Sequence, residues 1–108
     1  MSDTPRWTLP TLMYHEGAPG HHFQISASHL IENLPLIRKV SPFTAYVEGW
    51  ALYAEFIAHN DMNVYEDDPL GNLGRLQDEM LRAIRLVVDT GMHAKRWSRE
   101  RAIEYMLS

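Results

Sequence analysis

The chain has 108 residues, of which 45% are hydrophobic, and its net charge is −4 with neutral histidines. This length predicts a single domain over residues 1–108, and the apolar fraction predicts a folded core instead of disorder. The interspersed charges exclude the one-sided basic surface of a nucleic-acid-binding protein, and no apolar run approaches the roughly 20 residues of a membrane span.

Cysteine is absent from the sequence, whereas histidine occurs six times. Disulfide-stabilised folds and thiolate-bound zinc are therefore excluded, and any metal must bind His, Asp or Glu. The first residues show no signal-sequence pattern, so a cytoplasmic location is the default expectation. A fragment of a longer protein would leave export open.

Apolar residues recur at helical spacing, and no stretch alternates with the period of a β-strand. We therefore expect an all-α fold of about four to five helices. A first helix is predicted over residues 10–16, and glycine and proline then interrupt it at residues 17–20. Helix resumes over residues 21–30 or 21–31, and residues 32–40 are expected to be a connector.

A second helix is predicted from Ser41, a good N-cap, and Pro42, a good first residue, to about residues 59–60. Its apolar residues recur at intervals of three and four, which predicts a buried stripe. The stripe consists of Phe43, Val47, Trp50, Ala54 and Ile57.

A third helix is predicted to start at the cap and proline pair Asp68-Pro69 and to stop near Gly91. Ser98 is expected to cap a final short helix. The third helix carries a continuous apolar face of about five turns. This face consists of Leu70, Leu73, Leu76, Met80, Leu81, Ile84, Val87 and Val88.

The pair His15-Glu16 is followed by Gly-Ala-Pro-Gly and then by His21-His22. Zinc peptidases need two imidazoles that face one metal, with a glutamate beside the first as general base. The usual interval between the histidines is four residues, which places both on one helical face. A step of seven residues in a regular helix nearly restores the starting face and favours His22, whereas a bulge at the Gly-Pro insert favours His21. We select His21, although such pairs and doublets are also common on protein surfaces.

Two glutamates flank the apolar stripe of the second helix. Glu48 follows Val47, and Glu55 lies two turns later on the same flank. A carboxylate beside an apolar face is costly unless it is paired or bound to a metal. Zinc sites with two histidines and one glutamate take the third ligand from a separate helix, which fits Glu48. Glu55 is either a hydrogen-bonding partner of a ligating histidine or a solvated charge.

Four polar residues share one side of the third helix at steps of three, four and four. They are Arg82, Arg85, Asp89 and His93. Spacing alone favours a solvated ladder of ion pairs, which contributes little stability. The functional alternative is that an arginine or His93 stabilises an oxyanion or binds a substrate carboxylate.

Three blocks of the sequence together resemble the bacterial family called domain of unknown function 885. The blocks are LPTLMYHEGAPGHHFQ, AYVEGWALYAE and RAIRLVVDTGMHAKRWSRERAIEYM, and they cover the chain from about Leu9 to Met106. Members of this family are long helical proteins regarded as zinc-dependent peptidases of the gluzincin kind. The resemblance implies Zn²⁺ bound by His15, His21 and Glu48, with Glu16 as general base.

The resemblance also implies roles around these ligands. Gln24 would orient a ligand, Tyr46 would hydrogen-bond the substrate, and Asp89 and His93 gain an active-site role. His93, Tyr46 or an arginine would support the oxyanion. The remaining residues expected near the ligands or the substrate are His22, Glu55 and Arg85.

Relatives are several times longer than this chain, which is therefore expected to be the catalytic core of a longer peptidase-like protein. Three functions follow: a zinc peptidase acting on peptide substrates, a metal-binding helical module that is inactive without its flanks, or a structural interaction domain. Apolar faces left uncovered by missing flanks predict a symmetric homodimer.

Overall fold

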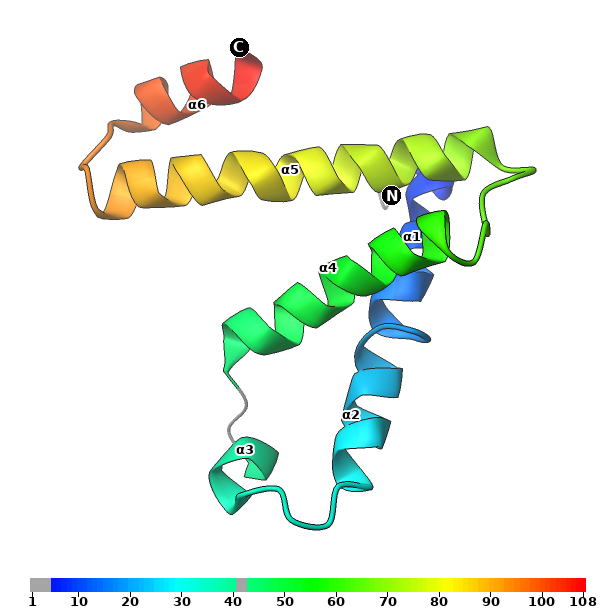
Figure 1. The fold of residues 1–108 in the computed structure, drawn as a ribbon. Coiled ribbons are helices and arrows are strands. Elements are labelled where there is room, and N and C mark those ends of the chain that lie inside the picture. The colour runs from blue at the N-terminus through cyan, green and yellow to red at the C-terminus, as the bar shows by residue number, and fades with distance from the viewer. Residues whose placement is uncertain (1–4, 41–42) are drawn as a thin grey trace. The chain divides into compact units, whose positions relative to one another are not determined.

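The structure, a computed structural model, describes residues 5–40 and 43–108 of the chain. Within these ranges every regular element is helical, as Figure 1 shows. The elements are η1 (Arg6–Thr8), α1 (Leu9–Glu16), α2 (His21–His29), α3 (Leu36–Val40), α4 (Thr44–Asn60), α5 (Pro69–His93) and α6 (Arg99–Leu107). The prediction of an all-α fold is confirmed, and the five predicted helices correspond to α1, α2, α4, α5 and α6.

The segment expected to be a connector contains the short helix α3 at its end. The predicted cap pair Ser41-Pro42 lies outside the described residues. Helix α4 begins at Thr44, and the extended backbone of Phe43 precedes it. At the other end, α4 stops at Asn60, which agrees with the prediction.

The predicted buried stripe of α4 is confirmed at Ala54 and wrong at Phe43, while its other members Val47, Trp50 and Ile57 are half-buried. Phe43 is 76% exposed, whereas Ala51, Ala54 and Ala58 are fully buried, together with Glu55. Helix α1 packs against α4, and methyl side chains allow two helix backbones to approach closely. The buried face of α4 is therefore set by small residues, and the larger ones lie at its margins.

The chain forms two compact units, Met1–Arg75 and Leu76–Ser108, and the boundary between them falls inside α5. In the first unit, α1 and α2 pack against α4 and against each other. This unit holds both helices of the histidine motif and the helix that carries the two glutamates. Whether residues 1–108 behave as a single domain stays a prediction.

Helix α5 starts as predicted, because the Asp68 carboxylate accepts a hydrogen bond of 2.9 Å from the Gly71 backbone N–H. The predicted stop at Gly91 is wrong, since the helix continues to His93. Gly91 is buried, and a Cβ added there would collide with the Trp97 ring. This glycine therefore makes room for a side chain beside the helix instead of ending it.

The final helix α6 has the predicted cap. The Ser98 hydroxyl accepts a hydrogen bond of 3.2 Å from the Arg101 backbone N–H, and the Arg101 guanidinium lies 4.5 Å from the centroid of the Trp97 ring. Among the described residues, no helix combines the length and the apolar character that crossing a membrane requires.

Candidate metal centre

The turn between α1 and α2 brings the two halves of the histidine motif together. The Gly17 N–H bonds to the Met13 carbonyl at 2.8 Å and ends α1, and the Gln24 N–H bonds to the Gly20 carbonyl at 3.0 Å and starts α2. A Cβ at Gly20 would collide with the carbonyl oxygens of Tyr14 and His15. Only glycine therefore allows the chain to pass this close to the end of α1.

This turn makes His21 the partner of His15. The centroids of their two rings lie 4.8 Å apart with the ring planes at 90°, while the neighbouring His22 is exposed. The argument from a regular helix favoured His22, but it requires one continuous helix axis. Because α2 starts on a new axis after the turn, a count of residues per turn does not apply across it.

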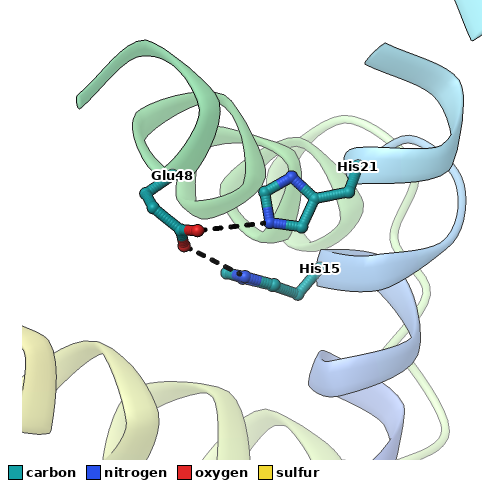
Figure 2. Close-up of side chains that lie close together, drawn as sticks. All are labelled: His15, His21 and Glu48. Atoms are coloured by element: carbon teal, nitrogen blue, oxygen red, sulfur yellow. Dashed lines mark ion pairs between the residues drawn. The ribbon is translucent and has the colours of Figure 1, made fainter. Parts of the chain in front are cut away.

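The two imidazoles face one carboxylate from α4, as Figure 2 shows. The His15 Nε2 lies 3.7 Å from Glu48 Oε2, and the His21 Nε2 lies 3.8 Å from Glu48 Oε1. One ligand atom from each of the three residues lies within 4.8 Å of the other two. The structure thus brings together all three residues predicted to bind the metal.

Behind His15, a buried carboxylate fixes the orientation of the imidazole. The His15 Nδ1 lies 2.7 Å from Glu55 Oε1, and the Thr11 hydroxyl donates a hydrogen bond of 2.7 Å to Glu55 Oε2. Glu55 is 1% exposed and Thr11 is fully buried. Since a carboxylate only accepts hydrogen bonds, Nδ1 donates its hydrogen bond to Glu55, and Nε2 is the nitrogen that faces Glu48.

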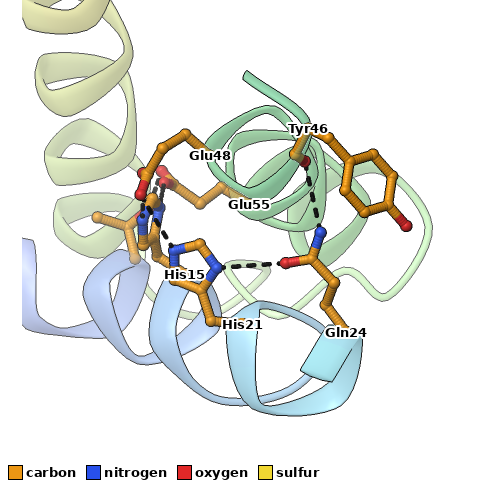
Figure 3. A network of polar contacts seen from close by, with 7 residues as sticks. His15, His21, Gln24, Tyr46, Glu48 and Glu55 are labelled. Carbon is orange, nitrogen blue, oxygen red and sulfur yellow. Dashed lines mark hydrogen bonds and ion pairs between the residues drawn. The ribbon is translucent and has the colours of Figure 1, made fainter. Parts of the chain in front are cut away.

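His21 is oriented by an amide instead of a carboxylate. Its Nδ1 lies 3.4 Å from the Gln24 Oε1, and the Gln24 Nε2 donates a hydrogen bond of 3.4 Å to the Tyr46 carbonyl oxygen. Figure 3 shows this network beside the Glu55 one. With the Gln24 oxygen as acceptor for Nδ1–H, Nε2 is again the nitrogen that faces Glu48.

One donor atom from each of the three residues lies within 4.8 Å of the others, so a small inward shift of the side chains would bring them to the separations of ligands around a common ion. Contacts of 3.7 and 3.8 Å are too long to be N–H···O hydrogen bonds. Ligand atoms bound tetrahedrally to zinc at about 2.1 Å lie roughly 3.4 Å apart. Two imidazole nitrogens and one carboxylate also form a donor set that zinc accepts, with a fourth position left for water or substrate.

Access to the cluster is from the side of Glu48. The side chains of His15 and His21 are 9% and 15% exposed, whereas that of Glu48 is 59% exposed. A small molecule can therefore approach the carboxylate while the packed helices hold the imidazoles from behind.

The remaining predicted site residues of the first unit surround the cluster unequally. Glu16 is exposed at the end of α1, directly after His15. Tyr46 is 55% exposed, and its backbone carbonyl oxygen accepts the hydrogen bond that joins it to the network. Their catalytic roles stay predictions.

The predicted residues of the third block belong to the second unit. Asp89 and His93 form an exposed pair one turn apart on α5, with 3.7 Å between Asp89 Oδ2 and His93 Nε2. Arg85 is exposed on the same helix. This geometry is that of the solvated ladder, and an active-site role for these three residues stays a prediction.

Thr11 was not predicted from the sequence, and Trp50 was placed in an apolar stripe without a role at the site. Thr11 lies four residues before His15, so helical spacing alone places both on one face of α1. Trp50 donates a hydrogen bond of 2.9 Å from its indole Nε1 to the Pro19 carbonyl and thereby joins α4 to the turn. Only the folded turn reveals this second contact, because the two residues are far apart in the sequence.

Tyr65 borders the buried network. It is 6% exposed, and its ring meets the edge of Tyr14 at a centroid distance of 5.9 Å. Burial raises the pKa of the Tyr65 phenol above its ordinary value of 10.0, and the Thr11 hydroxyl opposes this rise to a smaller extent. Tyr65 therefore stays neutral at physiological pH and adds no charge beside Glu55.

Comparisons with known proteins identify a family and a similar structure. A family model described as "Bacterial protein of unknown function (DUF885)" matches residues 1–108. The chain is similar, with 56% identity and a TM-score of 0.86, to a structure described as "The crystal structure of the putative lipoprotein from Colwellia psychrerythraea". The match covers 94% of this chain but only 17% of that one. No curated protein matches the chain.

Proposed function

The chain belongs to the DUF885 family of bacterial proteins, and on that premise we propose that it is the metal-binding core of a zinc-dependent peptidase. The family description names no activity, so the support comes from the geometry of the cluster. The observation that carries the proposal is that two Nε2 atoms face one carboxylate while both Nδ1 atoms are engaged from behind.

The three clustered residues His15, His21 and Glu48 would hold the ion. Zinc supplies Lewis-acid chemistry when it is bound by such a set: it polarises a carbonyl group and makes water more acidic. The chain contributes the orientation of the ligands. Glu55 and Gln24 hold the imidazoles in the tautomer that binds a metal, so that little reorganisation is needed on binding.

Glu16 is the general base in this proposal. Its carboxylate accepts a proton from water and delivers it to the amine that leaves when the peptide bond breaks. Glu16 directly follows a ligating histidine and is exposed, so it is free to meet a substrate. The Tyr46 phenol, also exposed, is a candidate donor to the oxyanion.

The test is the substitution Glu16→Gln, which removes the base without removing a ligand. We expect the zinc-loaded variant to retain its metal and to hydrolyse peptides at least about a hundredfold more slowly, the usual contribution of a general base. Cleavage of a peptide library is followed by mass spectrometry. The exposed Glu32 provides a matched control, and Glu32→Gln should cleave at the rate of the unmodified chain.

A second function, metal binding without hydrolysis, is favoured by one observation. The Glu48 side chain is 59% exposed, so the described residues enclose little of a peptide at the cluster. Positioning accounts for a large share of enzymatic rate. Zinc bound by the unmodified chain without any cleavage that depends on Glu16 would establish this second function and refute the first.

A further inference from the structure

A cavity of about 520 Å³ adjoins the candidate metal centre in the first unit. Gln24 and Tyr46 line it, and these are also the residues whose hydrogen bonds hold His21 (Figure 3). The cavity therefore lies next to the cluster, with one amide side chain shared between them. Its volume is within the range of small-molecule sites, about 300–1,000 Å³.

The lining combines apolar walls with positive charge. Leu34 and Val47 are half-buried apolar residues of the wall, while Arg38 and Lys39 contribute two cations. None of the described residues that line the cavity is acidic. Within the described ranges, no ion pair joins Arg38 or Lys39 to a carboxylate.

Such a lining selects a ligand that carries an apolar group directly beside an anion. An internal residue of a peptide has an apolar side chain but no charge on its backbone. A C-terminal residue has both, because its free carboxylate is attached to the same Cα as its side chain. Arg38 can bind that carboxylate through paired N–H groups, and Lys39 can bind it as a point charge.

We infer that this cavity binds the C-terminal residue of a peptide, with an apolar side chain against Leu34 and Val47 and the terminal carboxylate on Arg38 and Lys39. One consequence of this inference rests on the proposed function. If the chain is a peptidase, the bond that it cleaves lies close to the carboxyl end of the peptide. Hydrolysis there adds water across the peptide bond, leaving a new carboxylate on the longer fragment and an amine on the released one.

The experiment measures binding without cleavage. N-acetyl-Ala-Ala-Leu, its C-terminal amide and octanoate are titrated calorimetrically into the full chain carrying Glu16→Gln, with a chelator present. We expect the free acid to bind about tenfold more tightly than the amide, the effect of losing one charge-assisted contact. Octanoate, which has a carboxylate and an apolar chain but no peptide group, should bind more weakly than the peptide acid.

Paired charge variants then assign the preference to the cavity. Arg38→Gln with Lys39→Gln should remove the preference for the acid, whereas Lys95→Gln with Arg99→Gln, exposed cations that do not line the cavity, should retain it. Unchanged circular dichroism verifies that each variant is folded. Equal binding of acid and amide, no binding, tighter binding of octanoate, or a preference that survives in the first pair would overturn the inference.

This result is independent of the outcome for the proposed function. Zinc and cleavage play no part in the titration, so a chain that fails to hydrolyse peptides but prefers the free acid retains the inferred cavity and loses only the peptidase. A chain that hydrolyses peptides but binds the acid and the amide equally well retains the proposed function and loses the inferred cavity.

Discussion

Each imidazole of the candidate centre is held by a different kind of partner. His15 meets a buried carboxylate at 2.7 Å, whereas His21 meets a neutral amide at 3.4 Å. A carboxylate behind a ligating histidine makes the ring a stronger metal ligand and fixes its direction. If the cluster binds a metal, His15 would therefore be the more firmly oriented ligand and His21 the less firmly oriented one.

The first prediction concerns this carboxylate. Glu55→Gln retains the shape of the side chain but removes its charge. We expect zinc to bind about tenfold more weakly, which is the usual effect of removing the hydrogen-bonding partner of a metal-binding histidine. Competition with a chromogenic chelator measures the affinity. Glu66, an exposed glutamate, serves as the control, and Glu66→Gln should have no effect. Equal zinc affinity in Glu55→Gln and the unmodified chain would contradict a role for Glu55 in orienting His15.

Residue types and spacing predicted the cluster well but left Glu55 undecided. His15, Glu16 and the second histidine stand out as a motif, and Glu48 is the carboxylate expected from another helix. Spacing could not show whether Glu55 faces solvent or protein, since that depends on where α1 packs against α4. The structure buries it to 1% exposure.

At the level of secondary structure, the turn between α1 and α2 matters most. In a continuous helix the two histidines would stand four residues apart. Here the turn separates two helices, with His15 near the end of α1 and His21 at the start of α2. The Trp50 indole holds the turn from α4 through the Pro19 carbonyl at 2.9 Å. The positions of both ligands therefore depend on contacts outside the motif itself.

The second prediction tests this turn with two glycines. Gly20→Ala places a Cβ against the carbonyl oxygens of Tyr14 and His15, whereas Gly49→Ala meets nothing within 4 Å on α4. We expect Gly20→Ala to lower the melting temperature and to weaken zinc binding. Gly49→Ala should raise stability by about 0.5–1 kcal/mol, because alanine favours a helix interior. Thermal denaturation compares the two, and a Gly20→Ala chain as stable as Gly49→Ala would contradict the close approach.

Helix boundaries were predictable where a local cap decides them. Asp68 and Ser98 both accept the expected backbone hydrogen bonds. Gly91 was misread as a stop, because a glycine that accommodates a neighbouring ring has the same local sequence signal as one that ends a helix. Contact with Trp97 is a tertiary feature, so local reasoning could not identify it.

For the whole molecule, exposed apolar surface is the most prominent property. Leu30, Leu86 and Leu107 are 82%, 76% and 83% exposed, and many other large apolar side chains are exposed on α2, α4 and α5. Large apolar patches are unusual on monomeric soluble proteins and mark surfaces that bind partners. The sequence predicted apolar faces from their helical period, but it could not show which of them the fold leaves uncovered.

The third prediction is self-association through these faces. We expect the isolated 108-residue chain to form a symmetric dimer, so that light scattering coupled to size exclusion gives about twice the chain mass of 12.5 kDa. Leu86→Lys, which places a charge on an exposed apolar position, should shift the equilibrium toward the monomer. A monomer of unmodified chain at every concentration would contradict the expectation.

The central claim is that His15, His21 and Glu48 bind one zinc ion, and calorimetric titration of zinc into chelator-stripped protein tests it most directly. We expect about one ion per chain. Zinc affinity should fall at least about a hundredfold in each of His15→Ala, His21→Ala and Glu48→Ala, because a metal ligand contributes more than a residue that only hydrogen-bonds to a ligand. His22→Ala and His29→Ala, which replace exposed histidines, should bind zinc as the unmodified chain does. Absence of binding, or equal affinity in all of these proteins, would contradict the claim.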